Sequence, residues 1–214
     1  MPTSKADIYN RTLANLGQLS GQEIADPDEE SVNANALNRF YPESLDSFLE
    51  ECWWGFARKY QFISLDGSTP PEHWTYAYTY PSDSVSPRFI VGDAPEDRIE
   101  FEEGQSAGGL AVIWTDRKNA ELCYTARVEN YNAWGGAAIT AFSFKLAADS
   151  AALFSGGSKN AELLQGKYEF ALDKAMDVTH ARGEPRREDN KELIDFRHGE
   201  DPSERFSSRF DNKL

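Results

Sequence analysis

The spacing of apolar residues changes twice along this chain, and these two changes limit the folds open to it. In residues 4–59 large apolar side chains recur every three or four positions, which is the period of an amphipathic α-helix. In residues 60–130 they alternate with polar residues between turn-forming Pro, Gly, Asn and Asp, which is typical of short antiparallel strands. Helical spacing returns in residues 133–182. The pattern predicts an α+β fold, predominantly a bundle of about four helices, with an antiparallel β-sheet inserted between the second and the third.

The first two helices have recognisable ends in the sequence. Ser4 and Asp7 have the spacing of a capping box, and Gly17 is a natural residue for the end of the first helix. The second helix is expected over about residues 31–58, because a single apolar stripe continues over that length. Pro42 lies inside this stripe, so we expect a kink or a break close to it.

The later elements follow from the same periods. Five or six strands are expected between the helices, and the step from Trp114 to Leu122 resembles a hairpin. Residues 137–154 are Ala-rich and apolar nearly all round, which indicates a central helix, and a last helix is expected over residues 159–181. Four side chains are expected to be buried where the helix pairs meet: Trp54, Phe56, Phe142 and Leu146.

Residues 183–214 have a different composition from the rest. They hold nine acidic and seven basic residues and too few large apolar side chains to form a core. We therefore divide the chain into a folded domain, residues 1–182, and an extended C-terminal tail, residues 183–214. The tail carries isolated apolar anchors that we expect to dock on a partner: Leu193, Ile194, Phe196, Phe206 and Phe210.

The overall charge disfavours two classes of partner. With 36 acidic against 22 basic residues the net charge is −14, so the chain has no general attraction for nucleic acid or for anionic membranes. No apolar run approaches the ~20 residues of a membrane span, and the N-terminus does not resemble a secretory signal. Cys52 and Cys123 are far apart in the sequence, and we expect two buried, reduced thiols in an intracellular protein.

The sequence offers no recognisable catalytic, metal or cofactor site. The three histidines stand apart from other ligands, Cys52 lies on an apolar helix stripe, and Glu100 and Glu102 fit the solvated face of a strand. Residues 104–109 are glycine-rich without the pattern of a phosphate loop, which predicts a hairpin turn. The aromatic run in residues 74–80 indicates core packing or a protein interface. We expect a protein that is not an enzyme and needs no cofactor.

Several short stretches in residues 1–182 are similar to one known family. They are Ile8-Tyr9 with Leu13-Ala14 and Leu16-Gly17, Trp54-Gly55-Phe56-Ala57, Trp74-Thr75-Tyr76-Ala77-Tyr78 with Pro81-Ser82-Asp83, Thr115-Asp116 with Tyr124, and Phe142 with Leu146-Ala147. On these stretches the chain resembles the head-to-tail adaptor of short-tailed bacteriophages, the tail tubular protein A family. None of the stretches is catalytic, and Pro42 and the long tail are less typical of the family.

The resemblance implies a structural virion protein of the neck and tail, assembled in the host cytoplasm. It implies a dodecameric ring that binds the portal protein above and the tail nozzle protein below, with tail fibres at the side in some relatives. Double-stranded DNA would pass through the lumen during genome ejection without specific binding. Two alternatives stay open: a soluble α+β binding or regulatory protein working as a monomer or dimer, and an enzyme with an unrecognised site between the bundle and the sheet.

Overall fold

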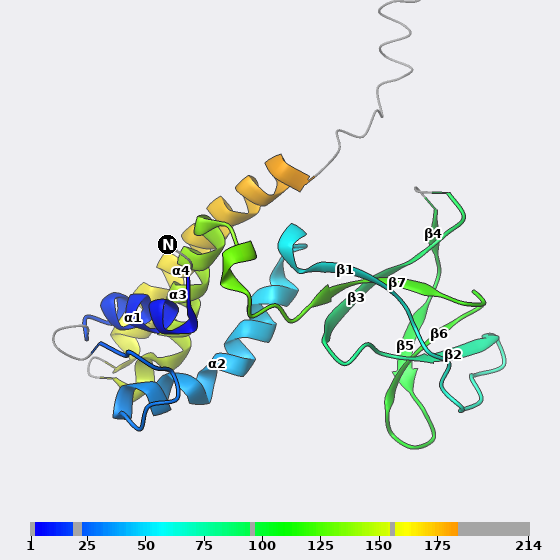
Figure 1. Cartoon of the computed structure of the whole chain (residues 1–214), viewed down its shortest axis with the longest axis horizontal. Helices are drawn as coiled ribbons and strands as arrows, with labels where there is room; N and C mark the ends of the chain where they lie inside the picture. Colours follow the sequence, from blue (N-terminus) through cyan, green and yellow to red (C-terminus); the bar gives the residue numbers. More distant parts are fainter. Residues whose placement is uncertain (1–2, 19–22, 95–96, 155–156, 184–214) are drawn as a thin grey trace, which may run out of the picture. The chain divides into compact units, whose positions relative to one another are not determined.

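The computed structural model describes residues 3–18, 23–94, 97–154 and 157–183, and it confirms the α+β class (Figure 1). Its four α-helices are α1 (Lys5–Asn15), α2 (Val32–Glu51), α3 (Gly136–Ser150) and α4 (Gly157–Gly183). The contacts divide the chain into two units, Met1–Thr179 and His180–Leu214, and only the end of α4 is described in the second. The predicted tail and its anchors therefore lie outside the described residues, except for Gly183.

Helix α1 begins after Ser4, at the capping box that the sequence predicts. The hydroxyl of Ser4 accepts a hydrogen bond from the amide of Asp7 at 3.1 Å, and the Asp7 carboxylate accepts one from the amide of Ser4 at 2.8 Å. This reciprocal pair satisfies two of the amides that a helix leaves without partners at its N-terminus. Gly17 follows the helix with a φ of 73°, a left-handed conformation that favours glycine.

Helix α2 differs from the prediction in two ways. It continues through Pro42 without a break, and it ends at Glu51 because Cys52 is extended and residues Gly55–Ala57 form a short 3-10 turn. Trp54 explains this early end. Its indole folds back and donates a hydrogen bond to the carbonyl of Phe48 at 2.9 Å, which satisfies an acceptor in the last turn of the helix.

The helical core is built on a cluster of aromatic rings. Phe48 lies 4.7 Å from Trp54, 5.5 Å from Trp134 and 5.4 Å from Phe142, measured between ring centroids. The central helix is α3, which packs against both α1 and α2 as predicted. Trp54, Phe142 and Leu146 are fully buried, whereas the prediction for Phe56 is wrong. Phe56 is only partly buried, because it stacks on the edge of this core from the 3-10 turn.

The inserted region forms two antiparallel sheets, not one. The first has the order β1-β7-β3-β4, and the second has the order β2-β6-β5. Their bounds are β1 (Arg58–Phe62), β2 (Tyr76–Thr79), β3 (Ser84–Val91), β4 (Arg98–Ile99), β5 (Glu102–Gln105), β6 (Ala111–Thr115) and β7 (Glu121–Ala126). The two sheets share one apolar core, in which Ile90 and Leu122 of the first meet Tyr78 and Ile113 of the second.

The hairpin predicted from Trp114 to Leu122 is therefore wrong. Strand β6 pairs with β2 and β5 on its two sides, and β7 pairs with β1 and β3. The connecting turn passes from one sheet to the other, because neither strand has a free side to offer its neighbour in the sequence. The hairpin that does form joins β5 and β6, at the glycine-rich residues 104–109 where a turn was expected.

Candidate interaction surface

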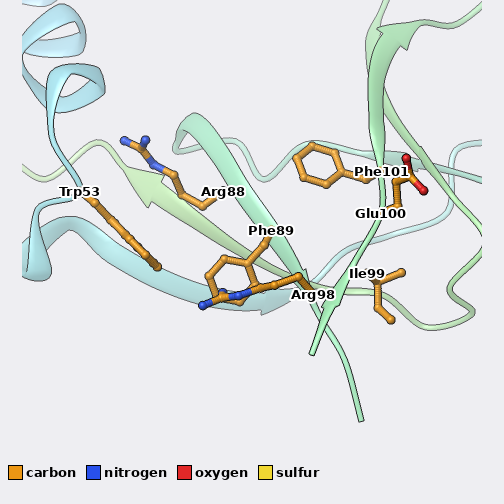
Figure 2. Close-up of a pocket in the computed structure, with 7 residues that line it drawn as sticks. All are labelled: Trp53, Arg88, Phe89, Arg98, Ile99, Glu100 and Phe101. Atoms are coloured by element: carbon orange, nitrogen blue, oxygen red, sulfur yellow. The ribbon is translucent and has the colours of Figure 1, made fainter. Parts of the chain in front are cut away.

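The five residues that the sequence marks for docking, Leu193, Ile194, Phe196, Phe206 and Phe210, all lie outside the described residues. Within the described structure the candidate site is an open groove of about 590 Å³ beside the end of α2. Its lining comes from three separate segments of the chain and consists of Trp53, Arg88, Phe89, Arg98, Ile99, Glu100 and Phe101 (Figure 2).

Two arginines stack on aromatic rings that line this groove. The guanidinium of Arg98 lies 3.3 Å from the ring centroid of Phe89, and that of Arg58 lies 4.3 Å from the ring of Trp53. The Trp53 and Phe89 rings meet edge to face at 5.8 Å. Cation–π contacts of this kind hold each guanidinium in place without neutralising its charge. The arrangement is therefore both ordered and positively charged.

The strand register explains why these residues meet. Tyr60 of β1 and Phe89 of β3 both lie opposite Cys123 of β7, so their side chains share one face of the sheet. Tyr60 packs against Phe89 at 6.3 Å, and Cys123 is fully buried between them. Burial raises the pKa of the Cys123 thiol, as it does for the buried Cys52. Both cysteines are free, which agrees with the reading of Cys52 as a small core residue.

Arg88 ties the groove to the helical part. Its Nε donates to the hydroxyl of Thr125 at 2.8 Å, while Nη2 reaches the carbonyls of Glu50 and Cys52 at 3.3 and 3.4 Å. These two carbonyls belong to the C-terminal end of α2, where the helix dipole favours a cation. The extended backbone at Cys52 thus serves two purposes: it directs Trp53 into the groove and presents a carbonyl to Arg88.

The groove has an excess of positive charge on an acidic chain, because Arg88 and Arg98 line it together with Glu100, and Arg58 stacks on its Trp53. Among the described residues, Arg58, Arg88 and Arg98 form no ion pair, whereas Arg117 pairs with Asp93 and Arg127 with Asp46. Because Arg58 and Arg98 have no carboxylate partner among the described residues, a partner that brings carboxylate or carbonyl oxygens fits this surface best.

The aromatic run in residues 74–80 serves the fold. Tyr78 is buried and donates to the carbonyl of Arg117 at 2.8 Å, which confirms core packing for this residue. Trp74 donates to Glu102 at 2.8 Å, and this hydrogen bond is the main reason why the pKa of Glu102 is lowered. Glu100 and Glu102 are both exposed, as expected for a solvated face.

The described ranges also bear on metal binding and membrane insertion. No group of three His, Cys, Asp or Glu side chains there could hold a metal ion, and no described helix is long and apolar enough to cross a membrane. His73 contacts Glu102 at 3.3 Å on the surface, and His198 lies outside the described residues.

The groove was missed at the sequence level because its residues are far apart in the chain. A usable signal was present, since Arg58 and Tyr60 follow the Trp53-Trp54 pair closely and form a basic, aromatic stretch in an acidic chain. Comparison of the chain with protein-family models and with curated proteins found no match to either.

Proposed function

We propose that this chain is a structural virion protein, the head-to-tail adaptor of a short-tailed bacteriophage. Copies of it would form a ring between the portal and the tail nozzle, through which the genome leaves the capsid. The proposal rests on the family resemblance of residues 1–182 and is supported by the α+β fold. The observation that carries it is the groove, whose arginine and aromatic side chains are those enriched at protein interfaces.

The residues of the resemblance form part of the rigid scaffold of the described fold. Trp54 closes the end of α2 on the aromatic core, and Phe142 and Leu146 place α3 at the centre of the bundle. The stretch from Trp74 to Asp83 forms β2 and the turn that leads into β3. A docking protein needs a rigid scaffold of this kind, because partners must meet its surface in a fixed geometry.

The charge of the chain suits a conduit for DNA. A net charge of −14 repels the phosphate backbone, so a duplex inside a ring of such chains would slide instead of sticking. The positive groove does not contradict this, because Arg58 and Arg98 stack on aromatic rings and would face a protein partner in the proposed assembly.

Mixing the purified full chain with the portal protein of the same genome tests the proposal. We expect a ring on one end of the portal, seen by electron microscopy and as a co-migrating complex in size-exclusion chromatography. Arg98→Glu should weaken this assembly more than Arg39→Glu, which makes the same charge change at an exposed site on α2. A chain that stays a monomer or dimer and never binds the portal would favour the alternative, an α+β binding or regulatory protein.

A further inference from the structure

The two sheets each end in a strand whose outer side is unpaired in the described structure. Strand β1 is one edge of the first sheet, and β5 is one edge of the second (Figure 1). Edge strands offer a row of unused amides and carbonyls, and most proteins protect them from pairing with other chains. On β1 the side chains of Tyr60 and Phe62 keep 52% and 67% of their surface accessible, and no described strand pairs with the outer side of β1 or of β5.

The register shows which backbone groups of β1 point outward. The amide of Ile63 donates to the carbonyl of Ala120, which makes these two residues a hydrogen-bonded pair of the antiparallel ladder. Such pairs alternate with non-bonded ones, so Gln61 and Lys59 also turn their backbone groups toward β7. The amides and carbonyls of the intervening residues, Tyr60 and Phe62 among them, therefore face away from the sheet.

The same reasoning applies to β5. The amide of Ser106 donates to the carbonyl of Leu110, so residues 106, 104 and 102 direct their backbone groups toward β6. Glu103 and Gln105 then face the free edge. Both side chains are exposed, and nothing else in the described structure pairs with this edge.

The two edges differ in charge. Strand β1 carries Arg58, and its Lys59 pairs with Asp83. Strand β5 carries Glu102 and Glu103, which accept hydrogen bonds from Trp74 and from the Tyr80 hydroxyl but have no Lys or Arg partner in the described structure. A β1–β1 contact between copies would place like charges together, and so would a β5–β5 contact. A contact between β1 of one copy and β5 of the next places opposite charges together, which favours this pairing over the two symmetric ones.

We infer that β1 of one copy pairs with β5 of a second copy, so that each chain donates one edge and accepts another. This contact is heterologous, and contacts of this type build closed rings or open filaments instead of dimers. The inference rests on the proposed ring, for which it supplies the contact between neighbouring subunits. Backbone pairing gives the contact its direction, and the exposed Tyr60 and Phe62 side chains add apolar area to it.

Proline substitutions can block each edge separately. Tyr60→Pro removes an amide that points outward, so it breaks no backbone hydrogen bond within the sheet, and Gln105→Pro does the same on β5. Each variant of the full chain should self-associate at least about tenfold more weakly than the wild type in sedimentation velocity, a change expected from losing one or two backbone hydrogen bonds. The matched controls Tyr60→Thr and Gln105→Thr keep the amides, and they should lose less.

A mixture of the two proline variants gives the decisive result. Tyr60→Pro keeps its β5 edge and Gln105→Pro keeps its β1 edge, so an equimolar mixture should form heterodimers that grow no further. Added salt should weaken the wild-type contact, because opposite charges meet across it. Melting temperatures close to that of the wild type would show that both variants are folded, and formation of the heterodimer requires this as well.

The other outcomes separate the two proposals. If both proline variants still form wild-type rings on portals, the edge contact is wrong and the adaptor function stands. If only Tyr60→Pro blocks association, or if the mixture gives no heterodimer, β1 does not pair with β5. If the wild-type chain neither self-associates nor assembles on portals, the adaptor function fails, and the ring contact fails with it.

Discussion

Truncating Phe142 tests the account of the helical core. Its side chain is fully buried, and its ring lies 5.8 Å from Tyr41, 5.4 Å from Phe48 and 5.6 Å from Trp134. The substitution Phe142→Ala removes the ring that joins α3 to α2 and to the segment before α3. We expect it to be among the most destabilising single changes in the described part of the chain.

The magnitude follows from burial and from these ring contacts. Phe→Ala in a closed core costs about 3–5 kcal/mol, because the lost transfer free energy is joined by the cost of a cavity. Each aromatic pair adds roughly 0.5–1.5 kcal/mol in other proteins, although such terms are not additive. Three ring partners place Phe142 in the upper half of the range, at about 4–5 kcal/mol. For a domain of this size that corresponds to a fall in melting temperature of roughly 8–20 °C.

Chemical denaturation followed by tryptophan fluorescence would measure this change, with scanning calorimetry as a second method. Phe170→Ala on α4 is the matched control, because it removes the same ring from a side chain that is 62% exposed. The control should alter the free energy of unfolding by less than about 0.5 kcal/mol. A cost below about 1 kcal/mol for Phe142→Ala would refute the packing described here.

Four further outcomes are expected. Gly104→Ala should destabilise the β5–β6 hairpin, measured as a lower melting temperature, because an added Cβ would lie 2.1 Å from the Trp114 ring. Desolvation raises the pKa of Asp83, but hydrogen bonds led by that from Lys59 outweigh it and leave the pKa lowered. Asp83→Asn should therefore lower the melting temperature at pH 7, with a difference that shrinks below about pH 4 as the carboxylate is protonated. Deleting residues 184–214 should leave the melting temperature of the isolated protein nearly unchanged and weaken attachment to the portal; a large loss of stability would mean that the tail packs on its own domain. The chain should not bind duplex DNA in a gel-shift assay at physiological salt, and sub-micromolar, salt-sensitive binding would contradict the repulsive lumen.

The features that the sequence determined are local ones. The capping box at Ser4 needs only two side chains three residues apart, and it forms wherever a helix starts there. The Ala-rich helix α3 is apolar nearly all round, which predicts a central position in the bundle. The alternation of apolar and polar residues in 60–130 likewise predicted strands, because an extended chain puts every second side chain on one face.

Tertiary structure decided which strands pair and which side chains pack together. The alternation of apolar and polar residues identifies β6 and β7 as strands, but it does not identify their neighbours. It therefore could not predict that the two strands lie in different sheets. The apolar stripe of α2 continues past Glu51 in the sequence, but the chain is extended at Cys52 and the Trp54 indole donates to the carbonyl of Phe48. The interaction groove exists only because β7 lies between β1 and β3 and brings Tyr60 and Phe89 to one face. Pairing and burial are long-range effects, and they take precedence over local preference wherever the two compete.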